Sequence, residues 1–147
     1  INHFNGNKIL SFRMGNLRAN QIVEAQVRMV ALVSQKSKEG QTLRRQIDLK
    51  LERDLSLFFA LTWTVMHKID ANSPLYHYSL EDLIQENVEI SVSVIGYDSS
   101  FVQTVHANVI YSPEDIVFNR YFEDIVEVSH DGKVAAIDYS KFHNLKI

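Results

Sequence analysis

The stretch FRMGNLRANQIVEAQVRMVALV, residues 12–33, decides the fold of this chain. In its second half, apolar residues occupy one parity and polar residues the other: Val23, Ala25, Val27, Met29, Ala31 and Val33 against Glu24, Gln26 and Arg28. A period of two indicates a long β-strand with one buried and one solvent-facing side. In the first half, Arg13 and Arg18 flank Gly15-Asn16, a pair that favours a turn because both residues tolerate positive φ. The segment therefore predicts a basic turn that leads into a long, one-sided strand.

The composition is that of one globular domain covering residues 1–147. Hydrophobic residues make up 46% of the chain and charged residues 22%, which is enough for one buried core. The net charge of −3 argues against a nucleic-acid partner, and the lack of cysteine excludes disulfides and thiolate chemistry. No apolar run reaches the ~20 residues that cross a bilayer, so we expect a soluble chain. Because it begins at Ile1 without a methionine, the sequence reads as a piece of a longer protein.

Further alternating or apolar segments predict more strands along the chain. They lie at residues 8–14, 43–51, 55–65, 88–94, 101–111, 122–128 and 134–137. Residues 5–7, 71–74 and 130–132 carry turn sequences, residues 34–40 form a polar loop, and residues 96–100 are expected to break the strand before them. Ser79 and Asp82 form a capping-box pattern for a short helix to about Glu86, and Pro113 favours a single helical turn. Together these segments predict an all-β sandwich of two sheets with one or two short helices.

The sequence gives no sign of catalysis. The six histidines are scattered without metal-ligand spacing, no serine sits in a strand-turn-helix nucleophile elbow, and five glycines leave little material for a phosphate loop. We therefore expect no enzyme, no metal site and no cofactor.

Three ordered motifs span nearly the whole chain. The first runs from Phe12 to Arg18 and continues through Val23 to Arg28, the second is His67-Lys68-Ile69-Asp70-Ala71-Asn72-Ser73-Pro74-Leu75-Tyr76, and the third is Asp138-Tyr139-Ser140-Lys141-Phe142-His143. Together they resemble the cytoplasmic C-terminal domain of inward-rectifier potassium channels. Asn5-Gly6-Asn7 and the short loops are more similar to the prokaryotic members of the family.

The resemblance implies a fold and an assembly. The fold would be an immunoglobulin-like β-sandwich that forms a homotetrameric ring beneath the transmembrane pore domain of the same full-length chain, on the cytoplasmic face of the inner membrane. The vestibule of the ring would extend the pathway of K+, the permeant ion. The ring would also couple ligand or lipid binding to gating, with anionic phospholipids, polyamines or divalent cations as further partners.

The resemblance also assigns roles to individual residues. Glu24 matches a vestibule carboxylate that holds cations and polyamine blockers, and the neighbouring polar positions Gln26 and Arg28 are expected to line the same vestibule. The family's second vestibule acid is Ile95 here, which predicts weak polyamine block.

Two further elements follow from the same comparison of motifs. The segment from Gly96 to about Thr104, which includes Tyr97, Asp98, Ser99 and Ser100, matches the apical constriction loop. Arg18 matches a phosphoinositide-sensing position whose usual basic neighbour is Ala19 here, and Arg13 is the second candidate for coupling to lipid headgroups.

One alternative from another functional class stays open at this point. A monomeric immunoglobulin-like module could use a sheet edge or groove to hold a protein or a lipid. The outward row of Glu24, Gln26 and Arg28 favours the ring, because a strand this long needs a partner for its polar face.

Overall fold

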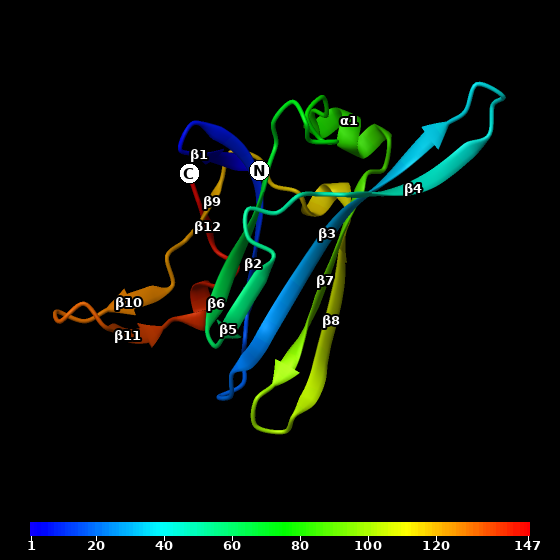
Figure 1. Ribbon diagram of the computed structural model, residues 1–147. Helices are drawn as coiled ribbons and strands as arrows, with labels where there is room; N and C mark the ends of the chain where they lie inside the picture. Colours follow the sequence, from blue (N-terminus) through cyan, green and yellow to red (C-terminus); the bar gives the residue numbers. More distant parts are fainter.

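The computed structural model describes residues 1–147, apart from the side chains of Val134 and Ala135. One sheet contains β1 (Asn2–Phe4), β2 (Asn7–Gly15) and β6 (Thr62–Lys68) in the order β1-β2-β6. The larger sheet contains β3 (Ile22–Lys36), β4 (Thr42–Asp48), β5 (Leu55–Phe59), β7 (Glu89–Asp98) and β8 (Gln103–Tyr111). Its order is β4-β3-β7-β8, and β5 pairs with the first part of β3. The two antiparallel sheets pack as the predicted all-β sandwich (Figure 1).

Strand β3 organises the larger sheet, since it pairs with β4, β5 and β7. The predicted alternation is confirmed from its middle onward. Its inward side chains are almost completely buried, namely Ala25, Val27, Met29, Ala31 and Val33. They face Trp63 and Val65 of β6 in one continuous hydrophobic core. Burial of this apolar stripe, at roughly 25 cal/mol per Å², holds the two sheets together.

Short helical elements close one end of the sandwich. Helix α1 (Leu80–Gln85) begins where predicted, because the Ser79 side chain accepts from the Asp82 amide and the Asp82 carboxylate accepts from the Ser79 amide. The 3-10 turn η1 (Pro113–Asp115) also forms at the predicted place. In Figure 1, α1 lies at the end of the molecule opposite the β7–β8 hairpin.

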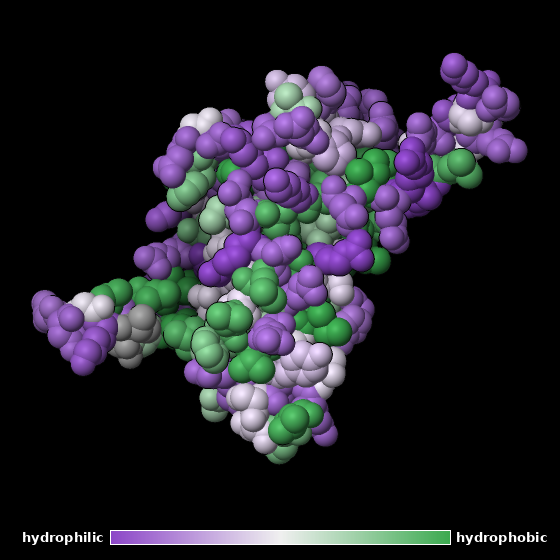
Figure 2. Space-filling view, in the orientation of Figure 1, coloured by the Kyte–Doolittle hydropathy of each residue, from purple (hydrophilic) through white to green (hydrophobic). Residues whose placement is uncertain are grey.

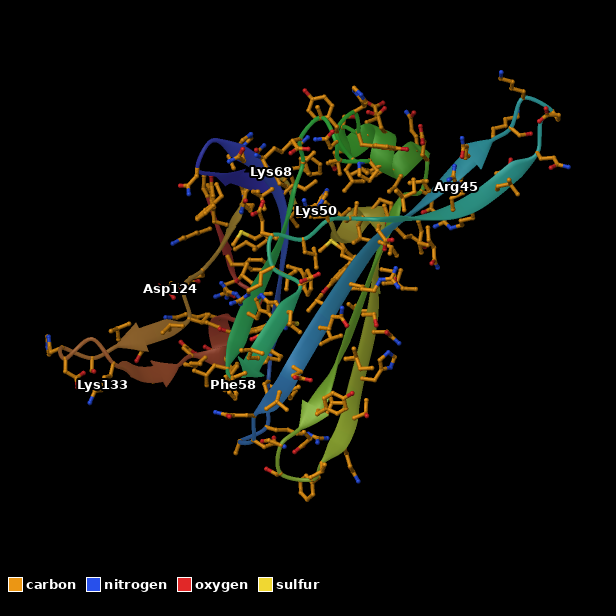
Figure 3. All side chains as sticks on the ribbon, in the orientation of Figure 1. Arg45, Lys50, Phe58, Lys68, Asp124 and Lys133 are labelled. Atoms are coloured by element: carbon orange, nitrogen blue, oxygen red, sulfur yellow. The ribbon has the colours of Figure 1, made fainter. Side chains whose placement is uncertain are left out.

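The C-terminal quarter wraps around the β2 side of the sandwich. Strand β9 (Tyr121–Phe122) pairs with β12 (Leu145–Lys146), and β10 (Val126–Val128) pairs with β11 (Val134–Ile137). Between them, the 3-10 turn η2 (Tyr139–Lys141) is capped by Asp138, whose carboxylate accepts from the Ser140 amide. The β10–β11 hairpin projects away from the body of the domain, with Lys133 at its tip (Figures 1 and 3).

Two predictions of strand boundaries were wrong because an apolar run hides a turn. Residues 55–65 were predicted as one core strand, but they form β5 and β6, which belong to different sheets. The chain turns at Ala60 and Leu61 without a glycine or proline to mark the place. Residues 122–128 likewise divide into β9 and β10, which have different partners.

Three other boundaries also differ from the predictions. Strand β2 continues through Gly15, and neither Gly15 nor Asn16 adopts positive φ, so the predicted turn falls later, at residues 17–20. A Cβ on Gly15 would lie 3.1 Å from the Phe142 ring, so this glycine makes room for a side chain. Strand β7 runs through Gly96 to Asp98 rather than breaking at Gly96, and β3 extends to Lys36, inside the predicted loop.

Candidate functional site

The candidate site lies at one end of the larger sheet, called here the apical end. It comprises residues 16–24, which are the connection from β2 to β3 and the start of β3, and residues 95–104, which form the end of the β7–β8 hairpin. Figure 1 shows the two turns side by side at the lower end of the view. The Ser99 amide and hydroxyl both donate to the carbonyl of Gln21, at 3.1 and 3.0 Å. Two segments far apart in sequence are therefore fastened together here.

A β-bulge in β3 places Glu24. The register between β3 and β7 shifts by one residue between Val23 and Gln26, and Glu24 has a φ of 50°. A bulge re-aims a side chain, and positive φ in a residue other than glycine is uncommon. The Glu24 side chain is exposed and forms no salt bridge with any residue that the structure describes. The bulge thus presents the unpaired carboxylate of Glu24 to solvent.

Gly96 is the residue of β7 that faces the bulge. A Cβ there would lie 2.5 Å from Ile22 Cγ2, 3.2 Å from Ala25 Cα and 3.3 Å from the Val23 carbonyl oxygen. Two of these contacts are with backbone, which cannot rotate away. Only glycine therefore lets β7 pass this closely beside the bulged strand.

The outer face of the sheet carries the other predicted vestibule positions. Gln26 and Arg28 are exposed, and Arg28 Nη2 donates to the Asp48 carboxylate at 2.8 Å. Gln26 is paired with Ile95 in the next strand, and Ile95 with His106 in the one after. The row across the sheet is therefore an amide, an aliphatic chain and an imidazole. His106 was missed at the sequence level, because only the register of β7 with β8 reveals its place.

Asp98 lies at the centre of the apical end and is only 2% exposed. One carboxylate oxygen accepts from the amides of Ser100 and Phe101, at 2.8 and 3.2 Å. The other accepts from Asn20 Nδ2 and lies 3.6 Å from Arg18 Nη1. A buried carboxylate needs such partners, because an unpaired one would cost several kcal/mol. Asp98 thus ties the hairpin turn to the β2–β3 connection.

The residues around Asp98 at the end of the hairpin are exposed. Tyr97, Ser99 and Ser100 face solvent, and Phe101 and Val102 expose 69% and 88% of their surface. Val102 has a φ of 51°. Of the predicted constriction segment, Gly96 to Asp98 belong to β7 and only residues 99–102 form the turn.

The two predicted lipid-coupling arginines lie in different surroundings. Arg18 is 70% exposed at its side chain and reaches back to Asp98. Asn16 supports it from inside: its Oδ1 accepts from the Arg18 amide at 3.0 Å, and its Nδ2 donates to the Asn20 carbonyl at 2.7 Å. Arg13 instead packs its guanidinium over the ring of Phe122, 4.6 Å from the centroid, and donates to the Glu123 carbonyl at 2.7 Å. Burial lowers the pKa of Arg13, and the nearby charge of Asp124 raises it in part.

The motif from His67 to Tyr76 has a structural role in this fold. His67 is buried, with Nδ1 2.7 Å from the Lys50 carbonyl and Nε2 2.7 Å from Ser73 Oγ. Ser73 Oγ also accepts from the Leu75 amide at 3.1 Å. This network fixes the chain after β6 to the segment that connects β4 to β5. Within the described residues, no three His, Asp or Glu side chains gather to hold a metal ion.

Apolar side chains are exposed on β5. Leu57 and Phe58 expose 61% and 67% of their surface, and Leu55 and Leu61 lie beside them in the chain with almost half of theirs exposed. Figure 2 shows hydrophobic residues gathered on this face of the molecule, and Phe58 is labelled in Figure 3. This β5 patch (Leu55, Leu57, Phe58 and Leu61) was not singled out from the sequence, where its apolar run was assigned to the core.

These features first define a structural class. The chain is an antiparallel β-sandwich domain in which a bulge presents an unpaired carboxylate beside two turns that hydrogen bonds hold together. The described part of the chain contains no helix long and apolar enough to cross a membrane. The whole of residues 1–147 matches the model of the inward rectifier potassium channel C-terminal domain. The chain therefore belongs to the inward-rectifier potassium channel family, whose members are channels and not enzymes.

Known members of this family are similar over almost the whole chain. Inward rectifier potassium channel Kirbac3.1 of Paramagnetospirillum magnetotacticum is 41% identical over 145 residues, which cover 99% of this chain and 49% of that protein. Inward rectifier potassium channel 4 of Homo sapiens and of Mus musculus is 35% identical over 144 residues, covering 94% of this chain and 32% of those proteins. The chain thus spans half or less of the length of these relatives.

Proposed function

We propose that this chain is the cytoplasmic regulatory domain of an inward-rectifier potassium channel and that four copies form a ring. The ring would sit beneath the pore, on the cytoplasmic side of the inner membrane, with the pore domain supplied by the rest of the polypeptide. K+ would pass along the axis of the ring. The observation that carries the proposal is the bulge in β3, which turns an unpaired Glu24 outward in a domain of this family.

In the proposed ring, the outward negative charge of Glu24 attracts cations. Four carboxylates around one aqueous axis add their potentials and attract cations, screened over ~8 Å at physiological salt. Gln26 and Arg28 line the same wall in this proposal. Arg28 is already matched by Asp48, so its positive charge does not cancel that of Glu24.

The apical end supplies a route from lipid to pore. Arg18 exposes its guanidinium while one nitrogen stays 3.6 Å from Asp98, whose carboxylate holds the turn at residues 99–102. An anionic headgroup on the open side of Arg18 would draw the guanidinium away from Asp98. Loss of that contact would loosen the turn, which we propose forms the apical constriction with Gly96, Tyr97, Ser99 and Ser100.

Polyamine and divalent cations are expected to block such a ring only weakly. Ile95 is 44% exposed beside Gln26, at the position where a second acid would double the charge of the wall. Introducing Ile95→Glu should therefore strengthen polyamine block in the full-length channel. Glu24→Gln should weaken whatever block exists, and an unchanged response to Ile95→Glu would show that this position does not face the axis.

The β5 patch is the surface that we assign to contacts within the ring. Large apolar side chains exposed together on one short segment favour an interaction site. Light scattering at increasing concentration tests the assignment directly. Phe58→Ser should reduce tetramer formation, while Leu43→Ser, which changes another exposed apolar residue on the β3–β4 hairpin, should leave it unchanged. A chain that stays monomeric at every concentration, alone and with its pore segment, would favour a monomeric binding module instead.

A further inference from the structure

A cavity of about 360 Å³ lies between β2, the larger sheet and the C-terminal segment, away from the apical end and from the proposed vestibule. It is lined by residues of β2, β3 and β7 and of the C-terminal segment. Most of its wall is apolar and comes from Phe12, Met29, Val92, Ile116, Phe122 and Phe142. Its volume is within the range of ~300–1,000 Å³ that holds small organic ligands.

The wall of the cavity also includes a positively charged side chain with an unused hydrogen-bond donor. Arg13 lines it, and Arg13 Nη1 is buried without a hydrogen-bond partner among the described residues. The rings of Phe122 and Phe142, 4.6 and 5.9 Å from the guanidinium carbon, cover its faces. A buried hydrogen-bond donor without an acceptor is destabilising, and more so when it carries a charge. An oxygen anion in the cavity would remove that destabilisation.

The acids near Arg13 are occupied elsewhere. Glu123 offers Arg13 only its main-chain oxygen, because its carboxylate accepts from Asn144 at 3.1 Å and lies 3.9 Å from Lys141. Asp115 lines the cavity, but its carboxylate accepts from the Ser112 amide and hydroxyl at 2.8 and 2.9 Å. Asp124, labelled in Figure 3, forms no salt bridge with Arg13 in the part of the chain described.

The other charged and polar side chains that line the cavity also favour an anion. Arg120 and His143 line the cavity beside Arg13, so basic side chains outnumber the single acid, Asp115. A monoanion suits the site better than a phosphate dianion, since only one guanidinium nitrogen is free and the surroundings are apolar. A carboxylate oxygen can accept a charge-assisted hydrogen bond from that one nitrogen.

We infer that this cavity is a binding site for a medium-chain fatty acid, with the carboxylate on Arg13 and the hydrocarbon chain against Met29, Val92 and Ile116. The acid would fasten the C-terminal segment to β2 and β3, because Phe122 and Phe142 come from the segment and Arg13 from the sheet. The site is independent of the proposed ring and its vestibule.

Binding can be tested on the 147-residue chain with decanoate kept below its micelle concentration. Labelling the methionine methyl groups with ¹³C gives an internal control, because Met29 lines the cavity and Met66 does not. The Met29 methyl signal should shift on addition of decanoate while that of Met66 stays in place. Calorimetry should give an affinity for decanoate at least about tenfold higher than for decanol, which has the chain without the charge. Acetate, which has the charge without the chain, should not bind.

Substitutions then assign the charge to Arg13. Arg13→Gln should lower the affinity for decanoate about tenfold and leave that for decanol unchanged, whereas Arg45→Gln, on the exposed β3–β4 hairpin, should change neither. Arg13→Lys keeps the charge and serves if the glutamine variant does not fold. Equal affinities for decanoate and decanol would overturn the inference, as would a Met29 signal that does not respond or acetate that binds as well as decanoate.

Discussion

The two halves of β3 differ in the regularity of their backbone. From Val27 to Val33 the strand is regular, and every second side chain enters the core. From Ile22 to Gln26 it carries a bulge, a residue with positive φ and an unpaired carboxylate, and it runs beside a glycine that allows no Cβ. The regular half stabilises the sandwich, and the irregular half shapes the surface that we assign to the ion pathway. Substitutions in the two halves should therefore have separable effects on stability and on conduction.

The largest effect should come from the regular half. Met29→Ala removes a side chain that is 2% exposed in the core and should lower the free energy of unfolding by about 2–4 kcal/mol. Gln26→Ala, on the outer face, should change it by less than about 0.5 kcal/mol. Urea denaturation followed by circular dichroism measures both. Similar losses for the two variants would contradict the one-sided burial of the strand.

The packing of the bulge should be the next most sensitive point. Gly96→Ala places a methyl group 2.5 Å from Ile22 Cγ2 and against backbone atoms of Val23 and Ala25. We expect a loss of about 1–3 kcal/mol, because the bulged backbone must shift to make room. Ser93→Ala, in the regular part of the same strand, is the matched control and should stay within about 0.5 kcal/mol. If Gly96→Ala leaves the free energy of unfolding unchanged, the backbone of the bulge deforms easily and does not fix the position of Glu24.

Arg18 should affect the response to lipid more than stability. Each basic charge near an anionic membrane surface contributes on the order of 1 kcal/mol, which is a several-fold change in affinity. Arg18→Gln should therefore shift the lipid dose-response of the reconstituted full-length channel, with Arg45→Gln as the control. If Arg18→Gln instead unfolds the chain or prevents assembly without any lipid effect, its contact with Asp98 is structural only.

The smallest effect on stability should be at Glu24 itself. It forms no salt bridge in the described structure, so Glu24→Gln should change the free energy of unfolding by less than about 0.5 kcal/mol. The same substitution should reduce inward rectification in recordings from the full-length channel. A clear loss of stability would show that Glu24 has a partner in the assembled protein and is not a free vestibule acid.

The sequence predicted the regular features because they depend on local pattern. The alternation through Val33, the capping box at Ser79 and the sandwich of two sheets all follow from residue periods and turn chemistry. The bulge at Glu24 could not be predicted, since it is a difference of register between β3 and β7. The division of residues 55–65 into β5 and β6 was hidden because Ala60 and Leu61 turn the chain without a glycine or proline.

The residues of the candidate site were proposed from the sequence, but their geometry could not be predicted from it. Asp98 was expected on a loop, yet it lies at the end of β7, is buried and joins two turns, which only long-range packing can produce. Arg18 was the first candidate for coupling to lipid headgroups and Arg13 the second, but the sequence could not show that their surroundings differ. The C-terminal segment, more than 100 residues later, encloses Arg13 and leaves Arg18 open.

The most direct test of the ring is a distance measurement at Gln26, on the outer face of β3. The chain has no cysteine, so Gln26→Cys gives one spin-labelling site per subunit once any cysteines elsewhere in the full-length channel are replaced. Pulsed electron spin resonance on the reconstituted channel should give two distances, in the ratio of the side of a square to its diagonal. A single distance, or no dipolar coupling between subunits, would contradict the four-fold vestibule.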